Sequence, residues 1–296
     1  MKKIILILTV LCISITSFAQ QDTSRVAKDS IMVERDNDTI RIGGMIILKN
    51  KTERDKRVVV TVGDKKKTKE NNFISTSSWL FDIGFSNWTD KTNYSSNSSL
   101  VNRPGSPDLA ENDLKLKSGK SVNVNIWLFM QKMNLIEHYV NLKYGLGVEL
   151  NNYRFKSAIS FHEGGLNPYN SSQNIPKAFI FRDSISFSKN KLAADYVTVT
   201  LMINFNTNPK SSRNSLKISA GVSMGYLYSS RNKQVSGERG KKKNGGDYDL
   251  DKWKFSYVGE LGLGSINFYG TYTPKSIFTN DLNFTPYNIG IRIGKL

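Results

Sequence analysis

The chain has 296 residues and carries 42 Lys and Arg against 25 Asp and Glu, which gives a formal charge of +17 at pH 7. Cys12 is its only cysteine, which excludes a disulfide framework, and its 2 histidines are too distant in sequence to form a zinc site. The basic residues are scattered and no nucleic-acid motif is present, so no nucleic-acid partner is expected. The favoured anionic neighbour is phosphate-bearing lipid or surface polysaccharide, with a plain Lys-rich soluble surface as the alternative. No metal or other cofactor is expected.

The N-terminus has the pattern of a secretory signal. Lys2 and Lys3 precede the apolar run IILILTVLCISI, and Ser17-Phe18-Ala19 supplies small residues at the cleavage position. The apolar run is shorter than the ~20 residues that a membrane-spanning helix needs. Residues 1–19 are therefore predicted to be a signal peptide that is removed on export.

Residues 20–76 differ in composition from the rest of the chain. They open with the polar stretch QDTSRVAKDS, which favours disorder. Thr39–Leu48 and Arg57–Gly63 then read as two short strands that pair as a small hairpin, and the basic run Lys65–Lys67 indicates a solvated linker. We expect a small periplasmic segment here, ahead of a main domain at residues 77–296.

Strict alternation of apolar and polar side chains recurs throughout the main domain. Leu142, Tyr144 and Leu146 share one parity, for example, while Lys143 and Gly145 share the other. This two-residue period predicts strands with one apolar and one polar face. Eight such stretches occur, at residues 78–86, 122–131, 139–155, 196–205, 216–228, 253–263, 266–273 and 287–294. In the second stretch the apolar parity comprises Val122, Val124, Ile126, Leu128 and Met130.

The connections between these strands alternate between long and short. Bacterial outer-membrane barrels have an even number of strands, long extracellular loops and short periplasmic turns. The sequence therefore predicts an all-β fold, an eight-stranded antiparallel up-and-down transmembrane β-barrel, with the N- and C-termini in the periplasm. The alternative is a soluble lipocalin-like cup with its apolar face inside. That fold is disfavoured because its outer face would consist mostly of Gly, Ser and Asn instead of Lys and Glu.

The polar face of the predicted barrel carries charges that would point into its lumen. An eight-strand barrel is narrow, so these charges should pair and fill the lumen instead of lining a pore. We predict that Glu149 and Glu260 pair with Lys143, Lys217 or Arg292. The full predicted lumen network is Asp82, Lys143, Glu149, Lys217, Glu260 and Arg292. Four aromatic residues toward strand ends are expected at the membrane interface, namely Trp79, Trp253, Tyr228 and Tyr287.

Three stretches carry a resemblance to a known group: the signal ending Ser17–Gln21, the strand pair Leu192–Phe205 with Ile218–Val222, and the closing strand Tyr287–Gly294. Together they resemble outer-membrane β-barrel proteins of Bacteroidetes, the broad PorT-like group. That group tends to have Pro where Thr200 stands, and its last strand often ends on an aromatic residue where this chain has Lys295-Leu296. The resemblance implies an outer-membrane location, recognition of the last strand by the barrel-assembly machinery, and for some members a link to protein secretion. It implies no catalytic residue.

No residue cluster points clearly to catalysis. His162 has Ser160 and Glu163 beside it in a long loop, which is the minimum for a hydrolase or acyltransferase site, and His138 lies at a short turn. The alternately spaced carboxylates of DYDLDKW lack the rest of a calcium-binding loop; they are Asp247, Asp249 and Asp251.

Three functional hypotheses follow from these observations. The favoured one is a non-enzymatic barrel in the lipid of the outer membrane that acts through its surface loops or periplasmic tail. It would have a structural, adhesion or secretion-accessory role with a surface or periplasmic protein partner. The alternatives are an enzyme acting at the barrel rim on lipid or peptide through His162, and a soluble ligand-binding barrel.

Overall fold

The computed structural model describes residues 39–42, 45–49, 58–62, 73–209, 211, 215–264 and 266–294. The predicted signal peptide at residues 1–19, the predicted linker Lys65–Lys67 and the ending Lys295-Leu296 lie outside the described residues. The chain divides into two compact units, Met1–Glu70 and Asn71–Leu296. No helix among the described residues is long and apolar enough to span a membrane.

The first unit contains a three-stranded antiparallel sheet. Its strands are β1 (Thr39–Ile42), β2 (Met45–Lys49) and β3 (Val58–Val62), in that order. The prediction of one strand at Thr39–Leu48 is therefore wrong, because that stretch supplies two strands. Ile42 stands opposite Met45, so the chain reverses between them, where the sequence has Gly43-Gly44. A glycine pair favours such a tight reversal, and alternation alone does not reveal it.

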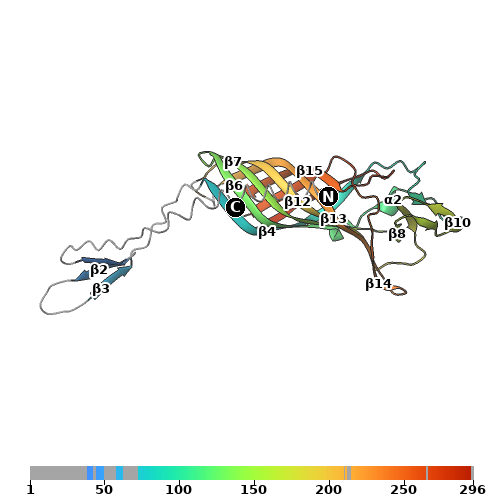
Figure 1. Cartoon of the computed structure of the whole chain (residues 1–296), viewed down its shortest axis with the longest axis horizontal. Helices are drawn as coiled ribbons and strands as arrows, with labels where there is room; N and C mark the ends of the chain where they lie inside the picture. Colours follow the sequence, from blue (N-terminus) through green and yellow to red (C-terminus); the bar gives the residue numbers. More distant parts are fainter. Residues whose placement is uncertain are drawn as a thin grey trace, which may run out of the picture. The chain divides into compact units, whose positions relative to one another are not determined.

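The second unit is built on a closed ring of eight antiparallel strands (Figure 1). Each ring strand pairs with the next along the chain, and the last pairs with the first, which closes the ring. All eight predicted strands are present. They are β4 (Ile74–Asp90), β6 (Val122–Ile136), β7 (Val140–Arg154), β12 (Lys189–Asn206), β13 (Leu216–Ser236), β15 (Trp253–Leu263), β16 (Ile266–Tyr272) and β17 (Phe284–Ile293).

Long and short connections are sorted to opposite ends of the ring. Short turns join β6 to β7, β12 to β13, and β15 to β16, at the end where β4 starts and β17 stops. We call this the turn end and the opposite one the loop end. The long connections at the loop end carry β5 (Leu100–Val101), α2 (Glu111–Leu114), η2 (Ser118–Lys120), β8 (Ile159–His162), β9 (Gly165–Asn167), β10 (Asn170–Ile175), β11 (Phe179–Arg182) and β14 (Gly240–Gly245). β14 pairs with the part of β13 that extends past the ring.

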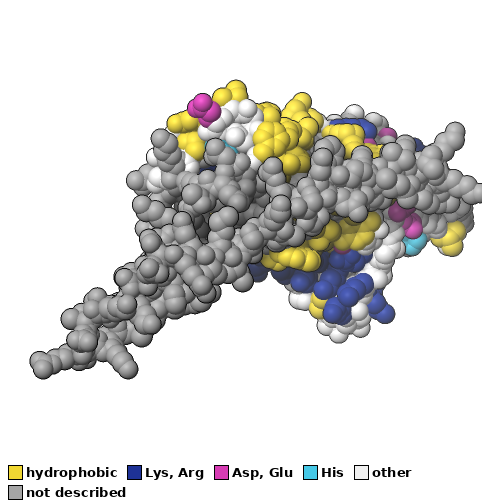
Figure 2. Space-filling model, turned by 60° about the vertical axis from the view of Figure 1, so that its left-hand side comes forward, with side chains coloured by type: hydrophobic (Ala, Val, Ile, Leu, Met, Phe, Trp, Pro, Cys, Tyr) yellow, Lys and Arg dark blue, Asp and Glu magenta, His cyan; other side chains and the backbone are white. Residues whose placement is uncertain are grey.

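The apolar parity of the strands faces outward. Val199, Val222 and Ile289 leave 48%, 51% and 63% of their surface exposed, whereas the inward Asn123 and Asn151 are fully buried. We call these outward side chains the apolar belt; it runs from Val197 to Phe205 on β12 and from Ile218 to Tyr228 on β13. Part of it is visible in yellow in Figure 2. A soluble cup needs this parity inside, so the lipocalin-like alternative does not fit the orientation.

One part of the predicted register is wrong, on β6. Trp127 stands opposite Gly147 and Phe129 opposite Leu146, so Leu128 is an extra residue that forms a β-bulge. A bulge reverses the parity of the residues beyond it. Met130, which alternation assigned to the apolar outer face, is therefore completely buried in the lumen. The pairing of β4 with β6 omits Trp79 at the same level, and Trp79 has a φ of 58°.

Inward glycines make room for large side chains inside the ring. A Cβ on Gly147 would lie 2.9 Å from an atom of the Trp127 ring. Gly84 and Gly290 stand directly opposite each other on β4 and β17, and a Cβ on either would collide with Tyr269 and with the facing strand. Small barrels fill their interior by alternating small and large residues in this way. The glycines on the polar face of the strands therefore allow large side chains to pack in the lumen.

A hydrophobic core covers the loop end of the ring. We call residues 91–121, 155–188, 237–252 and 273–283 the loop cap. Its four segments all contribute to this core, together with aromatic residues at the strand ends. The Trp88 ring lies 4.7 Å from that of Phe284 and 4.8 Å from that of Tyr153. Buried members from the four segments include Leu114, Phe161, Tyr248 and Phe278.

Candidate functional site

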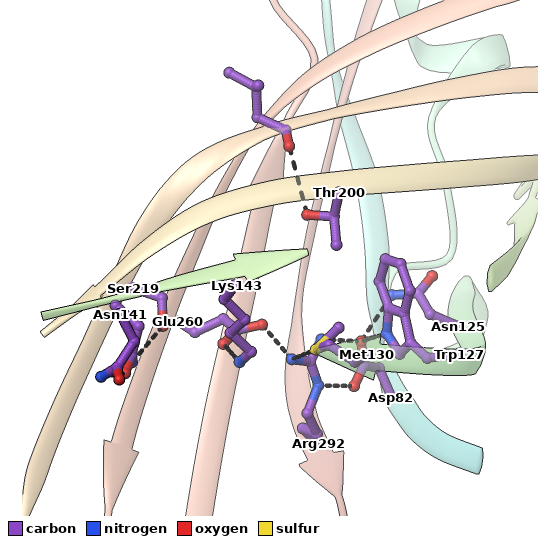
Figure 3. A network of polar contacts seen from close by, with 12 residues as sticks. Asp82, Asn125, Trp127, Met130, Asn141, Lys143, Thr200, Ser219, Glu260 and Arg292 are labelled. Carbon is purple, nitrogen blue, oxygen red and sulfur yellow. Dashed lines mark hydrogen bonds and ion pairs between the residues drawn. The ribbon is translucent and has the colours of Figure 1, made fainter. Parts of the chain in front are cut away.

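An ion-paired chain of side chains crosses the lumen toward the turn end (Figure 3). The Arg292 guanidinium donates from Nε to Asp82 Oδ1 at 2.6 Å and from Nη2 to Asp82 Oδ2 at 2.8 Å. Its Nη1 donates to Glu260, which also accepts a hydrogen bond from the Lys143 ammonium. These four residues come from β4, β17, β15 and β7, so the ion pairs connect four strands of the ring.

Asp82 has further partners that complete its environment. Trp127 Nε1 donates to its Oδ2 at 2.7 Å, and Asn125 Nδ2 donates to the same oxygen at 3.2 Å. The Asp82 side chain is fully buried. A buried carboxylate is tolerated only when it is paired and hydrogen-bonded, and Asp82 meets both conditions. Alternation placed Trp127 and Asn125 on the polar face but gave no sign that they bind Asp82.

A second buried ion pair lies between Glu149 and Lys254. Glu149 also accepts from Asn151 Nδ2 at 3.0 Å, and the Lys254 ammonium lies 4.6 Å from the centre of the Tyr196 ring. The sequence prediction paired Glu149 with Lys143, Lys217 or Arg292, and this part is corrected. Alternation identifies which residues face the lumen, but their height in the barrel depends on strand tilt and stagger, which it does not report.

Lys217 lies apart from both ion pairs. Among the described residues, the side chains of Lys217 and of the neighbouring Lys132 make no hydrogen bond or ion pair. Both line a cavity of about 30 Å³ at the turn end, together with Lys143, Glu260 and Arg292. A second cavity of about 20 Å³ lies deeper, beside Trp127 and Glu149. Each volume suffices for a water molecule or two.

The four predicted interface aromatics all lie on outward positions of the ring. Trp79, Trp253 and Tyr228 expose 63%, 46% and 52% of their surface, and Tyr287 is half-buried. Trp253 packs edge-on against Tyr226, with 4.9 Å between ring centres. Trp253 and Tyr228 border the loop end of the apolar belt, whereas Trp79 starts the belt on β4. Their placement at a membrane interface stays a prediction.

The candidate catalytic residues in the long loops do not converge. Ser160 donates to Asp183 Oδ2 at 2.8 Å, and Glu163 accepts from the backbone of Asp247. His162 stacks on Phe179 with 5.2 Å between ring centres, and within the described part of the chain its side chain has no hydrogen bond. Neither Ser160 nor Glu163 is therefore bound to His162.

Two of the three carboxylates of the candidate calcium loop bind different groups. Asp249 accepts from the backbone of Ala178 at 3.0 Å, and Asp251 pairs with Lys275 at 2.6 Å. No group of His, Cys, Asp and Glu side chains in the described residues has a metal-binding arrangement. Burial acts to raise the pKa of the Asp251 carboxyl, but the hydrogen bonds from Lys275 and from the Trp253 backbone, together with the Lys275 charge, outweigh it and lower that pKa below its usual value.

Polar contacts tie neighbouring segments of the loop cap to one another. Arg182 pairs with Asp113 at 2.9 Å and links the second segment to the first. Arg239 pairs with Asp183 at 3.0 Å and links the third segment to the second. The Asp251–Lys275 pair links the third to the fourth, and Ser98 donates to Asp281 to link the first and fourth. The cap is therefore one connected structure on a shared apolar core.

The architecture agrees with that of a known protein family. The family model described as "Outer membrane protein beta-barrel domain" matches residues 67–285. Among solved structures, Ail, the attachment invasion locus protein of Yersinia pestis, is similar at 13% identity, with 73% of this chain and 100% of that chain covered and a TM-score of 0.28. A mutant porin of Rhodopseudomonas blastica is similar at 8% identity, with 74% and 99% covered and a TM-score of 0.16. No match was found among the curated proteins.

Proposed function

Because the chain belongs to the outer membrane protein β-barrel domain family, we propose that it is a non-enzymatic outer-membrane barrel that acts through its loop cap or its periplasmic tail. In this proposal the lumen is closed by side chains. The task is structural, adhesive or accessory to secretion, and the partner is another protein at the cell surface or in the periplasm. The resemblance to the PorT-like group of Bacteroidetes supports the secretion-accessory variant.

One observation carries the proposal, namely the ion-paired chain from Asp82 through Arg292 and Glu260 to Lys143. It fills the lumen with side chains from four strands, and the remaining cavities are of water size. The core of the loop cap covers the other end. Eight-strand barrels have interiors that side chains just fill, whereas 16 or more strands leave a channel. The separate bonding of Ser160, His162 and Glu163 supports a role without catalysis.

The orientation follows the rule that outer-membrane barrels place long loops outside and short turns in the periplasm. The loop cap would then face the cell exterior, and both termini the periplasm. The last strand of the ring, β17, would be the segment that the barrel-assembly machinery recognises. Outer-membrane lipid would surround the apolar belt.

Conductance across a planar lipid bilayer tests the closed lumen. We expect the refolded protein to insert without giving discrete conductance steps. The comparison is a variant with Glu260→Ala and Arg292→Ala, which removes the centre of the ion-paired side chains. This variant should conduct if those side chains, and not the loop cap, seal the lumen. Steady ohmic conductance from the unchanged protein would contradict the proposal.

Labelling of engineered cysteines tests the orientation, because Cys12 is the only native cysteine and lies in the predicted signal peptide. Gly237→Cys lies in the loop cap, and a Cβ there meets nothing within 4 Å. Glu137→Cys lies in the exposed turn between β6 and β7. An impermeant reagent should label only Gly237→Cys on intact cells, and both after the outer membrane is opened. The reverse pattern would invert the orientation.

A further inference from the structure

Four cationic side chains form a row across neighbouring strands at the loop end. Arg154 on β7, Lys191 on β12, Lys233 on β13 and Lys243 on β14 stand directly opposite one another in register. Their neighbours Tyr153, Leu192 and Asn232 are fully buried on the inner face, so the row lies on the outer face. We call these four residues the basic row.

More positive charge surrounds the basic row on the same face. Lys189 and Lys241 both stand opposite Val235, and Arg231 is two positions before Lys233. Asp195 is the one carboxylate that pairs with this group in the described residues, and it binds Arg231 at 2.7 Å. The other contacts are to neutral oxygens: Arg154 Nη2 donates to Ser188 O at 2.7 Å, and the Lys191 ammonium donates to Asn152 Oδ1.

Like charges directly opposite each other weaken a strand pair. The basic row repeats this unfavourable arrangement across three strand interfaces without carboxylates to compensate it. Nothing in the packing of β12–β14 requires lysine at these outward positions, since the side chains are partly or fully exposed. An anion bound along the row would turn the repulsion into favourable pairing.

The same strands carry the apolar belt, which lies further toward the turn end than this charge. On β13 the belt ends at Tyr228, and Lys233 follows five residues later, which is about 17 Å along an extended strand and about 13 Å in height at the usual tilt. Figure 2 shows Lys and Arg side chains gathered next to the yellow apolar side chains. Phospholipid headgroups add only about 5–8 Å beyond each side of the hydrocarbon. Long lysine side chains can extend toward the membrane surface, and a glycolipid that carries several phosphates on its sugar rings offers them the highest density of negative charge there.

From this geometry we infer that the basic row binds the phosphate groups of an anionic glycolipid whose acyl chains lie against the apolar belt on β12 and β13. The occupant is a phosphorylated glycolipid of the outer leaflet, because only a lipid couples the apolar belt to charges above it. The inference rests on the proposed membrane location with the loop cap outside. It names a lipid site on the barrel wall and leaves the partner of the loop cap open.

The test compares lipid retention by the full-length mature protein in detergent, measured by native mass spectrometry. The probes are diphosphorylated lipid A, the same lipid without phosphates, phosphatidylglycerol, and inorganic pyrophosphate alone. We expect retention of diphosphorylated lipid A well above the other three. Equal retention of pyrophosphate would show a phosphate site without a lipid requirement, and equal retention of the dephosphorylated lipid would show an acyl-chain site without the basic row. Either result overturns the inference.

Variants separate the basic row from general positive charge. Lys191→Gln with Lys233→Gln and Lys243→Gln should weaken lipid A retention roughly a hundredfold, at about fivefold for each lysine near an anionic surface. Lys120→Gln with Lys177→Gln and Lys252→Gln makes the same charge change at exposed positions elsewhere in the loop cap and should leave retention unchanged. Equal loss in both triple variants would overturn the site.

Insertion of the same protein samples into lipid vesicles is measured separately, so that failure of the inference can be told from failure of the proposed function. If the protein inserts into vesicles but shows no preference for phosphorylated glycolipid, the inference fails and the proposed function stands. If the protein does not insert at all, both fail. Replacing the three lysines by arginine keeps the charge and should keep retention, which guards against misfolding of the Gln variant.

Discussion

Arg292 and Asp82 stand directly opposite each other on β17 and β4, and two hydrogen bonds of 2.6 Å and 2.8 Å join their side chains. These strands are the last and the first of the ring, so the ion pair lies where the ring closes. Both side chains are buried, and each has further partners on other strands. Closure of the ring therefore brings together charges that are stable in the lumen only as a pair.

Asp82→Ala should strongly destabilise the folded protein. The change leaves the buried Arg292 guanidinium with Glu260 alone and removes the acceptor of Trp127 Nε1. Loss of one partner of a buried ion pair costs about 3–5 kcal/mol. The measurement is reversible guanidinium unfolding in lipid vesicles. Lys275→Met, which breaks the exposed pair with Asp251, is the control and should cost below about 1 kcal/mol. Equal stability of Asp82→Ala and the unchanged protein would refute the buried pair.

Gly290→Ala should disrupt the closing strands. A Cβ at this position would collide with Ile83 O, with Gly84 Cα and with the Tyr269 ring. Overpacking of this kind costs about 1–3 kcal/mol or more. The matched control is Gly270→Ala, where the nearest atom to the added Cβ is Asn288 O at 3.7 Å. The folded fraction of the two variants after refolding should differ clearly. If both behave alike, the close approach of β4 and β17 is not as described.

Val222→Arg tests which medium the outer face meets. Val222 lies mid-way along the apolar belt on β13, with 51% of its surface exposed. An arginine on the lipid face near the bilayer centre costs about 2–4 kcal/mol, while the same change on a water-facing surface costs little. Unfolding in vesicles measures the cost, with Val222→Leu as the control of equal polarity. A cost-free arginine at this position would show that the belt faces water.

Phe278→Ala should loosen the loop cap and leave the ring intact. The Phe278 side chain is 4% exposed and packs against Phe161 and Phe284 in the shared core. Truncation of a buried phenylalanine costs about 3–5 kcal/mol where the structure cannot collapse around it. Limited proteolysis should cut the long loops faster while the ring strands stay protected. Unchanged cleavage would mean that the loops do not share one core.

The lumen residues could be predicted from sequence because strand side chains have a period of two. Asp82, Glu149 and Arg292 all fall on the polar parity, and the structure places them inside. The partner of Glu149 could not be predicted, because Lys254 reaches it through the tilt and stagger of the ring. Met130 could not be placed either, because the single extra residue Leu128 reverses the parity beyond it.

The core of the loop cap was missed for a different reason. Leu114, Phe161 and Phe278 lie in three separate connections without a regular period, and each alone reads as an isolated apolar residue in a polar loop. They become a core only when the ring brings the connections to one end. The basic row was hidden in the same way, since Lys191, Lys233 and Lys243 become neighbours only through strand pairing.

The central claim, a transmembrane barrel with a lipid-facing apolar belt, is tested most directly by the gel mobility of the mature protein refolded in detergent. The account predicts that the unheated sample migrates faster than the boiled one and that the protein stays dispersed only with detergent or lipid. A freely soluble protein with identical mobility before and after boiling would contradict it.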